Sequence, residues 1–116
     1  MPNYLLLLHE DMGQFEGQSP QDIMAITKEY IAWAERLRKD GKYVGSNKLT
    51  DEPGKVMRPK DGRVVITDGP YTETKELIGG YYCISAADYD EACRIAESSP
   101  HFRYGGRIEV RQIHDL

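Results

Sequence analysis

Asp68 is the side chain whose position most suggests chemistry, because it stands where a strand-like run ends and a turn begins. A polar stretch containing Glu73, Lys75 and Glu76 follows the turn. A carboxylate held at such a place could act as a general base or anchor a ligand, and a high density of ionisable groups is typical of functional sites. The alternative is that Asp68 only caps the turn by accepting backbone N–H bonds.

Glu109 and Arg111 form a second pair of candidates. They share one parity of the alternating run 107–113 and oppose Ile108 and Val110, which are expected to face the helices. Both charged side chains are therefore expected to point toward a cleft between two copies of the chain. Arg111 could bind a carboxylate through two parallel hydrogen bonds while Glu109 orients it. An ion pair across strands or across a subunit contact would explain the same residues without a ligand.

Lys75 and Tyr81 are expected to complete the polar lining of this site. Tyr81 and Tyr82 are neighbours in a strand-like run, so one ring is expected on each face of the sheet. Because they are large rings, a place in the core or in an interface fits them better than a catalytic role.

No metal site is expected. His9, Glu10 and Asp11 are consecutive, successive strand residues point to opposite faces, and no second histidine follows at helical spacing. His101 falls in a segment expected to be a loop and His114 lies near the end of the sequence, so both are expected to face solvent.

The first helix has clear start and stop signals. Ser19 fits the N-cap and Pro20 the first helical position. Apolar residues then recur at spacings of three and four from Ile23 to Leu37, and Gly41 fits the end of the helix. The pattern predicts one amphipathic helix with an apolar stripe.

The remaining elements follow from alternation and from turn residues. An Asp-Gly pair at 61–62 between two strand-like runs is a strong hairpin signal. The glycine pair at 79–80 indicates a bulge or a close approach of backbone. Strands are expected at 3–9, 42–49, 55–59, 63–67, 77–86 and 107–113, a second helix from 88 to about 100, and loops at 10–18 and 101–106.

This order predicts a single α+β domain over residues 1–116. Strand, helix, strand, hairpin, strand, helix, strand is a ferredoxin-like split βαβ sandwich with an inserted β-hairpin. Two helices cover only one face of such a sheet, yet the first strand has leucines at both parities. A second copy of the chain is the simplest cover for the other face, so a homodimer is expected.

Composition excludes several classes of protein. The 116 residues carry 15 Lys+Arg against 19 Asp+Glu, a net charge of −4, which disfavours binding to nucleic acid or to acidic membranes. The longest apolar run, Leu5 to Leu8, is far too short for a membrane helix, and no secretion signal is visible, so a cytoplasmic protein is expected. Cys83 and Cys93 are expected to be reduced packing residues. The glycine pairs lack the pattern of a phosphate-binding loop, and no cofactor is expected.

The run Asp68-Gly69-Pro70-Tyr71, followed by Thr-Glu-Thr-Lys-Glu and later by Gly-Gly-Tyr-Tyr, resembles the DGPF-motif branch of the YCII-related family. Tyr71 stands where the namesake phenylalanine would be. The resemblance implies a dimeric α/β barrel with a cleft where the two sheets meet. It also implies an association of some members with extracytoplasmic-function sigma factors.

Small members of the wider family are suspected of using a His-Asp pair with its histidine near the first helix. No histidine lies between residues 10 and 100 here, which leaves Asp68 as the remnant of that pair.

Two functions therefore stand as hypotheses. The first is a site for a small anionic molecule with general acid–base chemistry, in which Asp68 is the base and Arg111, Glu109, Lys75 and Tyr81 bind the ligand. The second is a non-catalytic regulatory module that contacts a partner such as a sigma factor through its surface.

Overall fold

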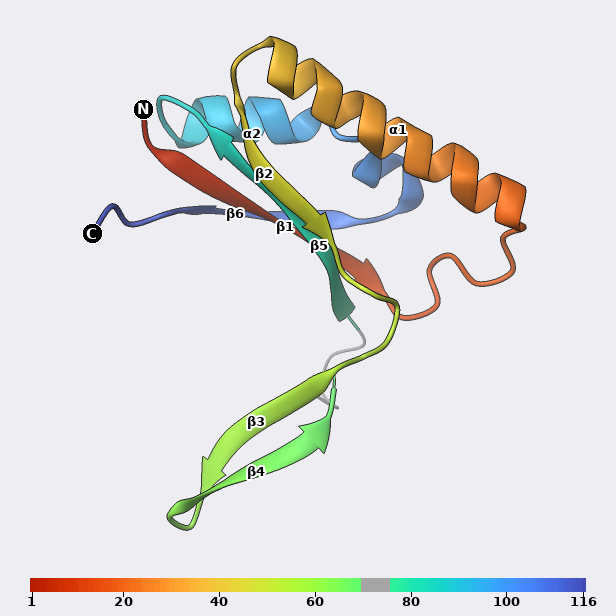
Figure 1. Ribbon diagram of the computed structural model, residues 1–116, viewed down its shortest axis with the longest axis vertical. Helices are drawn as coiled ribbons and strands as arrows, with labels where there is room; N and C mark the ends of the chain where they lie inside the picture. Colours follow the sequence, from red (N-terminus) through yellow and green to blue (C-terminus); the bar gives the residue numbers. More distant parts are fainter. Residues whose placement is uncertain (70–75) are drawn as a thin grey trace.

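A four-stranded antiparallel sheet forms the body of the protein, in a computed structural model that describes residues 1–69 and 76–116. The sheet has the strand order β2-β5-β1-β6, and two helices lie on one of its faces (Figure 1). This α+β arrangement agrees with a ferredoxin-like fold. The elements are β1 (Asn3–Asp11), α1 (Pro20–Lys39), β2 (Tyr43–Lys48), β3 (Lys55–Lys60), β4 (Arg63–Asp68), β5 (Glu76–Ser85), α2 (Tyr89–Glu97), the 3₁₀ helix η1 (Pro100–Tyr104) and β6 (Arg107–Gln112).

The central strand β1 divides the apolar side chains between the two faces of the sheet. Tyr4, Leu6 and Leu8 are buried beneath the helices, whereas Leu5 and Leu7, of the opposite parity, are only partly buried on the face that carries neither of the described helices. We call this second face, formed by β1, β2, β5 and β6, the open face. Strand alternation predicted this division, and the structure confirms it.

The core lies between α1 and the sheet. Trp33 and Leu37 of α1 are buried, and the Trp33 ring meets the Tyr82 ring edge to face with centroids 4.7 Å apart. The Trp33 indole N–H donates to Ser98 Oγ at 2.8 Å, so its one polar atom is satisfied. Tyr82 therefore packs in the core, and its neighbour Tyr81 lies on the open face, as predicted.

The signals at the ends of α1 are confirmed. Ser19 Oγ accepts from the Asp22 N–H at 3.1 Å, and the Asp22 carboxylate accepts from the Ser19 N–H, which completes a capping box. Asp40 is the C-cap, and Gly41 follows with φ +70°, in the left-handed region that glycine adopts without strain.

Strands β3 and β4 form a separate two-stranded sheet that projects from the body (Figure 1). We call residues 55–68 the arm. Asp61 and Gly62 both have positive φ, as a two-residue type I′ hairpin requires. Because of the arm, the radius of gyration is 16.0 Å, against about 13 Å for a compact domain of this size.

Two predictions about single residues were wrong. His101 was expected in a solvent-facing loop, but it lies in η1 and is only 1 % exposed. Cys93 was expected to pack, but it is exposed on α2, while Cys83 is partly buried on β5 and both thiols are free. Among the residues that the structure describes, no helix is long and apolar enough to cross a membrane.

Candidate functional site

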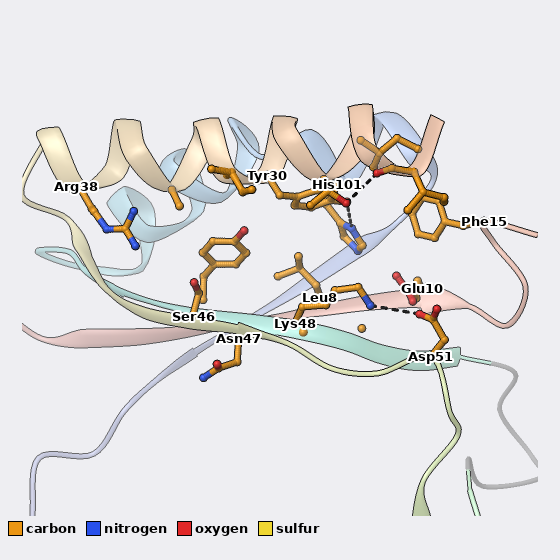
Figure 2. Close-up of a pocket in the computed structure, with 18 residues that line it drawn as sticks. Leu8, Glu10, Phe15, Tyr30, Arg38, Ser46, Asn47, Lys48, Asp51 and His101 are labelled. Atoms are coloured by element: carbon orange, nitrogen blue, oxygen red, sulfur yellow. Dashed lines mark hydrogen bonds and ion pairs between the residues drawn. The ribbon is translucent and has the colours of Figure 1, made fainter. Parts of the chain in front are cut away.

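A cavity of about 490 Å³ lies between α1 and the helix-facing side of the sheet (Figure 2). Such a volume suits a small organic molecule. The apolar side chains in the first half of α1 line this cavity and do not pack directly on the sheet. Ile23 is 39 % exposed as a result. The apolar wall consists of Leu8, Phe15, Ile23, Ile26, Ile31 and Tyr82.

A chain of hydrogen bonds runs into this cavity from β1 through His101 to Tyr30. His101 Nε2 lies 2.8 Å from the carbonyl oxygen of His9, and Nδ1 lies 2.9 Å from the Tyr30 hydroxyl. A carbonyl can only accept, so Nε2 must carry the hydrogen. In the neutral ring Nδ1 is then an acceptor, and the Tyr30 O–H donates to it. The Tyr30 oxygen is left with lone pairs for the cavity.

Burial holds both partners of this pair neutral. It lowers the pKa of His101, against a smaller upward effect of the hydrogen bond to His9 and with a further lowering by the charge of Arg107. It also raises the pKa of the Tyr30 phenol, and the charge of Glu10 adds to that rise. The neutral pair fixes the direction of the Tyr30–His101 hydrogen bond.

Gly106 makes room for the His101 ring. A Cβ atom at this position would lie 2.1 Å from His101 Nε2, far inside ordinary contact distance. The preceding Gly105 closes η1 in the left-handed conformation, with φ +80°. Two adjacent glycines therefore serve different ends, a turn and a close approach.

Glu10 brings a carboxyl group into the same cavity. The pairing of β1 with β5 is irregular next to Glu10. Leu8 pairs with Gly80 and His9 pairs with Ile78, so Gly79 is an unpaired bulge residue of β5. A Cβ atom on Gly79 would lie 2.6 Å from Glu10 Oε2, so the carboxyl group packs directly against this glycine. The predicted bulge is confirmed, and it is what makes space for Glu10.

The surroundings of the Glu10 carboxyl group raise its pKa. Burial raises its pKa, the charge of Asp51 raises it further, and the charge of Lys48 opposes both. Among residues 1–69 and 76–116, no hydrogen-bond donor is placed on this carboxyl group. A carboxyl group with a raised pKa in a cavity is a candidate for general acid–base chemistry.

Charged side chains stand at both ends of the cavity. Figure 2 shows Lys48 and Asp51 near Glu10, with an ion pair of 3.4 Å between them. Arg38 lies at the opposite end, with its guanidinium 4.3 Å from the centroid of the Tyr43 ring and an ion pair to Glu35. The cavity thus has an apolar middle and polar ends.

The residues predicted for a ligand site lie elsewhere. Glu109 and Arg111 are on β6, with Arg111 Nη1 3.4 Å from Glu109 Oε2. Glu109 also lies 3.1 Å from His9 Nε2, and both contacts lower the pKa of Glu109. Ile108 and Val110 pack against the core, so the two charged residues project on the open face as expected. Whether a second copy or a ligand meets them there stays a prediction.

Asp68 lies apart from that pair. It ends β4 on the arm, where its carboxylate is bonded to Lys55 and is largely exposed. Tyr81 is on the open face and accepts a hydrogen bond of 2.8 Å from Asn47 Nδ2. Lys75 lies outside the described residues. Among the contacts of the described residues, none joins Asp68 to Glu109 or Arg111.

The three consecutive residues His9, Glu10 and Asp11 at the end of β1 point to different surroundings. Glu10 faces the cavity, Asp11 forms an ion pair of 2.9 Å with Arg107, and His9 lies on the open face. Within residues 1–69 and 76–116, no group of three His, Cys, Asp or Glu side chains is placed to hold a metal ion.

Three cavity residues were missed by sequence reasoning: Glu10, Tyr30 and His101. Tyr30 was assigned to an apolar stripe and Glu10 to a loop. Alternation was the available signal for Glu10, because a first strand continued by two residues places Glu10 on the same face as Leu6 and Leu8. No local signal marked His101, whose partners are 71 and 92 residues away.

The protein is an α+β domain whose strand order agrees with a ferredoxin-like fold, with a cavity beneath its first helix. The YCII-related domain family model matches residues 3–116, and the chain belongs to this family. The chain is also similar to an uncharacterised protein of Rhizobium meliloti (strain 1021), R00369. The two are 27 % identical over 112 residues, which cover 95 % of this chain and 90 % of that protein. Neither comparison names an activity.

Proposed function

We propose that the protein binds a small organic molecule in the cavity beneath α1 and exchanges a proton with it through Glu10. The observation that supports this most strongly is the carboxyl group itself. It lies in a cavity of about 490 Å³ and has a raised pKa. Among the described residues no hydrogen-bond donor is placed on it. Burying such a group is costly, and proteins accept that cost mainly at functional sites. Tyr30 and His101 supply a second oriented group beside it.

Substitution of Glu10 tests this proposal. Glu10→Gln keeps the size of the side chain and removes the ionisable proton, so it is expected to alter ligand binding or turnover while the fold persists. Glu97→Gln is the matched control, because it makes the same change on the exposed side of α2, outside the cavity. A library of small aromatic and aliphatic molecules, screened by NMR against both variants and the wild type, measures the difference. Equal responses from all three proteins would contradict the proposal.

The second part of the proposal is a cytoplasmic homodimer in which two open faces meet. Leu5, Leu7, Tyr81 and Cys83 are partly buried in the single chain, although neither of the described α-helices covers them. A sheet with one apolar face uncovered gains free energy when a second copy covers it. The resulting two-sheet contact would be the dimeric α/β barrel implied by the DGPF-motif branch, to which we assign the chain on its Asp68-Gly69 run.

The open face could also hold an anion within that dimer. Arg111 is exposed and bonded to Glu109 alone among the described contacts. Its guanidinium presents two donors to a carboxylate and is oriented by Glu109, with Lys75 and Tyr81 as the remaining ligand-binding candidates and Asp68 as the candidate base. Arg111→Lys keeps the charge and removes the paired geometry, so binding of a small carboxylate should weaken, and unchanged binding would contradict this second site.

One feature favours a different function, a non-catalytic interaction module. The arm pairs Met57 with Ile66 and Pro59 with Val64, and this places Met57, Val64 and Ile66, each about 60 % exposed, on one face. An isolated two-stranded hairpin is marginal in water, so a protein partner such as a sigma factor is a candidate cover. Ile66→Lys should abolish binding of a purified extracytoplasmic-function sigma factor, and Thr67→Lys, on the other face, should not.

A further inference from the structure

We infer that the cavity ligand is a small apolar molecule bearing a primary amine, held by the Tyr30 oxygen and the Glu10 carboxylate. This inference rests on the proposed function and adds the class of ligand to it. It follows from the direction of the hydrogen bonds around His101, from the balance of charge at that end of the cavity and from the apolar wall.

The hydrogen bonds make this end of the cavity a poor place for another acceptor. His101 Nε2 donates to the His9 carbonyl oxygen, so the Tyr30 hydrogen is committed to Nδ1. The Tyr30 oxygen can then only accept from a ligand. The ionised Glu10 carboxyl group is also an acceptor. A ligand carboxylate or carbonyl would face lone pairs from both sides, whereas an amine offers hydrogens to both.

The balance of charge at this end of the cavity also favours an amine. Two carboxylates, Glu10 and Asp51, lie at this end with one ammonium group, that of Lys48. The Lys48 ammonium donates to the Leu49 carbonyl oxygen at 2.7 Å and contacts Asp51 at the mouth. Among the described residues, one negative charge at this end is therefore left without a cation, and a bound ammonium group would neutralise it. It would also reverse the raised pKa of Glu10, because an opposite charge nearby favours the ionised form.

The apolar lining of the rest of the cavity determines the kind of group that the amine must carry. Phe15, Ile23 and Ile26 line it together with the Tyr82 ring, and a ring or a branched alkyl group would bury this surface. The ammonium group fixes the orientation of the ligand in the cavity, and the apolar body supplies most of the binding free energy. Small aralkyl amines satisfy both requirements.

Three probes of one shape separate the possibilities: 2-phenylethylamine, 2-phenylethanol and phenylacetate. Each is titrated into the full chain near neutral pH, with Kd taken from NMR shifts of the Gly79 and Gly80 amides. The amine is expected to bind about 10-fold more tightly than phenylacetate, with the alcohol between them. Tyr30→Phe and Glu10→Gln should each weaken amine binding by about 10-fold. Tyr89→Phe removes a hydroxyl group outside the cavity, one bonded to the Gln112 N–H, and should change nothing.

Each outcome decides a different claim. Phenylacetate binding in the cavity as tightly as the amine would overturn the ligand class and leave the proposed function standing. No shift at the cavity amides with any of the three probes would overturn the proposed function itself. If Tyr30→Phe loses the dispersed NMR spectrum of a folded protein, Glu10→Gln carries the test alone. An unchanged amine affinity in that variant would overturn the inference.

Discussion

Gly106→Ala is the substitution whose effect the structure fixes most closely. The added Cβ would lie 2.1 Å from Nε2 of His101 and 2.4 Å from the two ring carbons beside it, where ordinary contact begins near 3.4 Å. The ring must therefore move by about an ångström. This breaks its 2.8 Å bond to the His9 carbonyl oxygen and its 2.9 Å bond to Tyr30.

The cost follows from those two bonds. Each contributes about 1 kcal/mol to the free energy of unfolding, and a buried group left without a partner costs about 1–3 kcal/mol. Gly106→Ala should thus destabilise the protein by about 2–4 kcal/mol, and Tm should fall by about 4 °C for each kcal/mol. Gly105→Ala is the control: its φ of +80° makes it strained, but no atom lies within 4 Å of its Cβ. It should cost only about 1 kcal/mol.

A double-mutant cycle assigns the cost to the ring. In a His101→Ala background the obstacle is gone, so Gly106→Ala should cost less than about 0.5 kcal/mol. Urea unfolding of the four proteins gives the coupling free energy. Equal costs for Gly106→Ala with and without His101 would refute the reasoning, because the penalty would then arise from the backbone.

Three further predictions concern the cavity and the dimer. Gly79→Ala should push the Glu10 carboxyl group into the cavity, because the new Cβ would lie 2.6 Å from Glu10 Oε2. The affinity for 2-phenylethylamine, measured by NMR titration, should then fall about 10-fold, while the free energy of unfolding changes by less than about 1 kcal/mol. The free energy of unfolding should decline as pH falls below about 6.5, because the pKa of His101 is lowered in the folded protein and the unfolded chain takes up the proton first. Urea unfolding of His101→Gln should show a smaller decline with pH. An equal decline in that variant would contradict the assignment to His101. Leu7→Glu on the open face should weaken dimer formation by about 100-fold in analytical ultracentrifugation, whereas Met24→Glu, on the exposed side of α1, should leave it unchanged.

The elements could be predicted from the sequence because their signals are local. Ser19 and Asp22 are three residues apart, and their capping box needs no other part of the chain. The Asp61-Gly62 turn likewise depends on two adjacent residues that tolerate positive φ. Strand alternation placed Ile108 and Val110 toward the core because a pleated strand leaves no other choice.

The cavity could not be predicted, because distant residues create it. Whether Tyr30 packs on the sheet or faces a void depends on how far the first half of α1 stands from β1, and periodicity does not contain that distance. His101 followed a proline, in a stretch that looked like a loop, and its burial depends on the missing Cβ of Gly106. Glu10 lies past the predicted end of the first strand, and the continuation of β1 to Asp11 places it on the same face as Leu6 and Leu8.

A crystal structure of the protein soaked with 2-phenylethylamine tests the central claim most directly. We expect the phenyl ring between α1 and the sheet, and the nitrogen within hydrogen-bond distance of the Tyr30 oxygen and the Glu10 carboxylate. An empty cavity at saturating amine, or a ring bound there with its nitrogen turned away from both residues toward Arg38, would contradict the account.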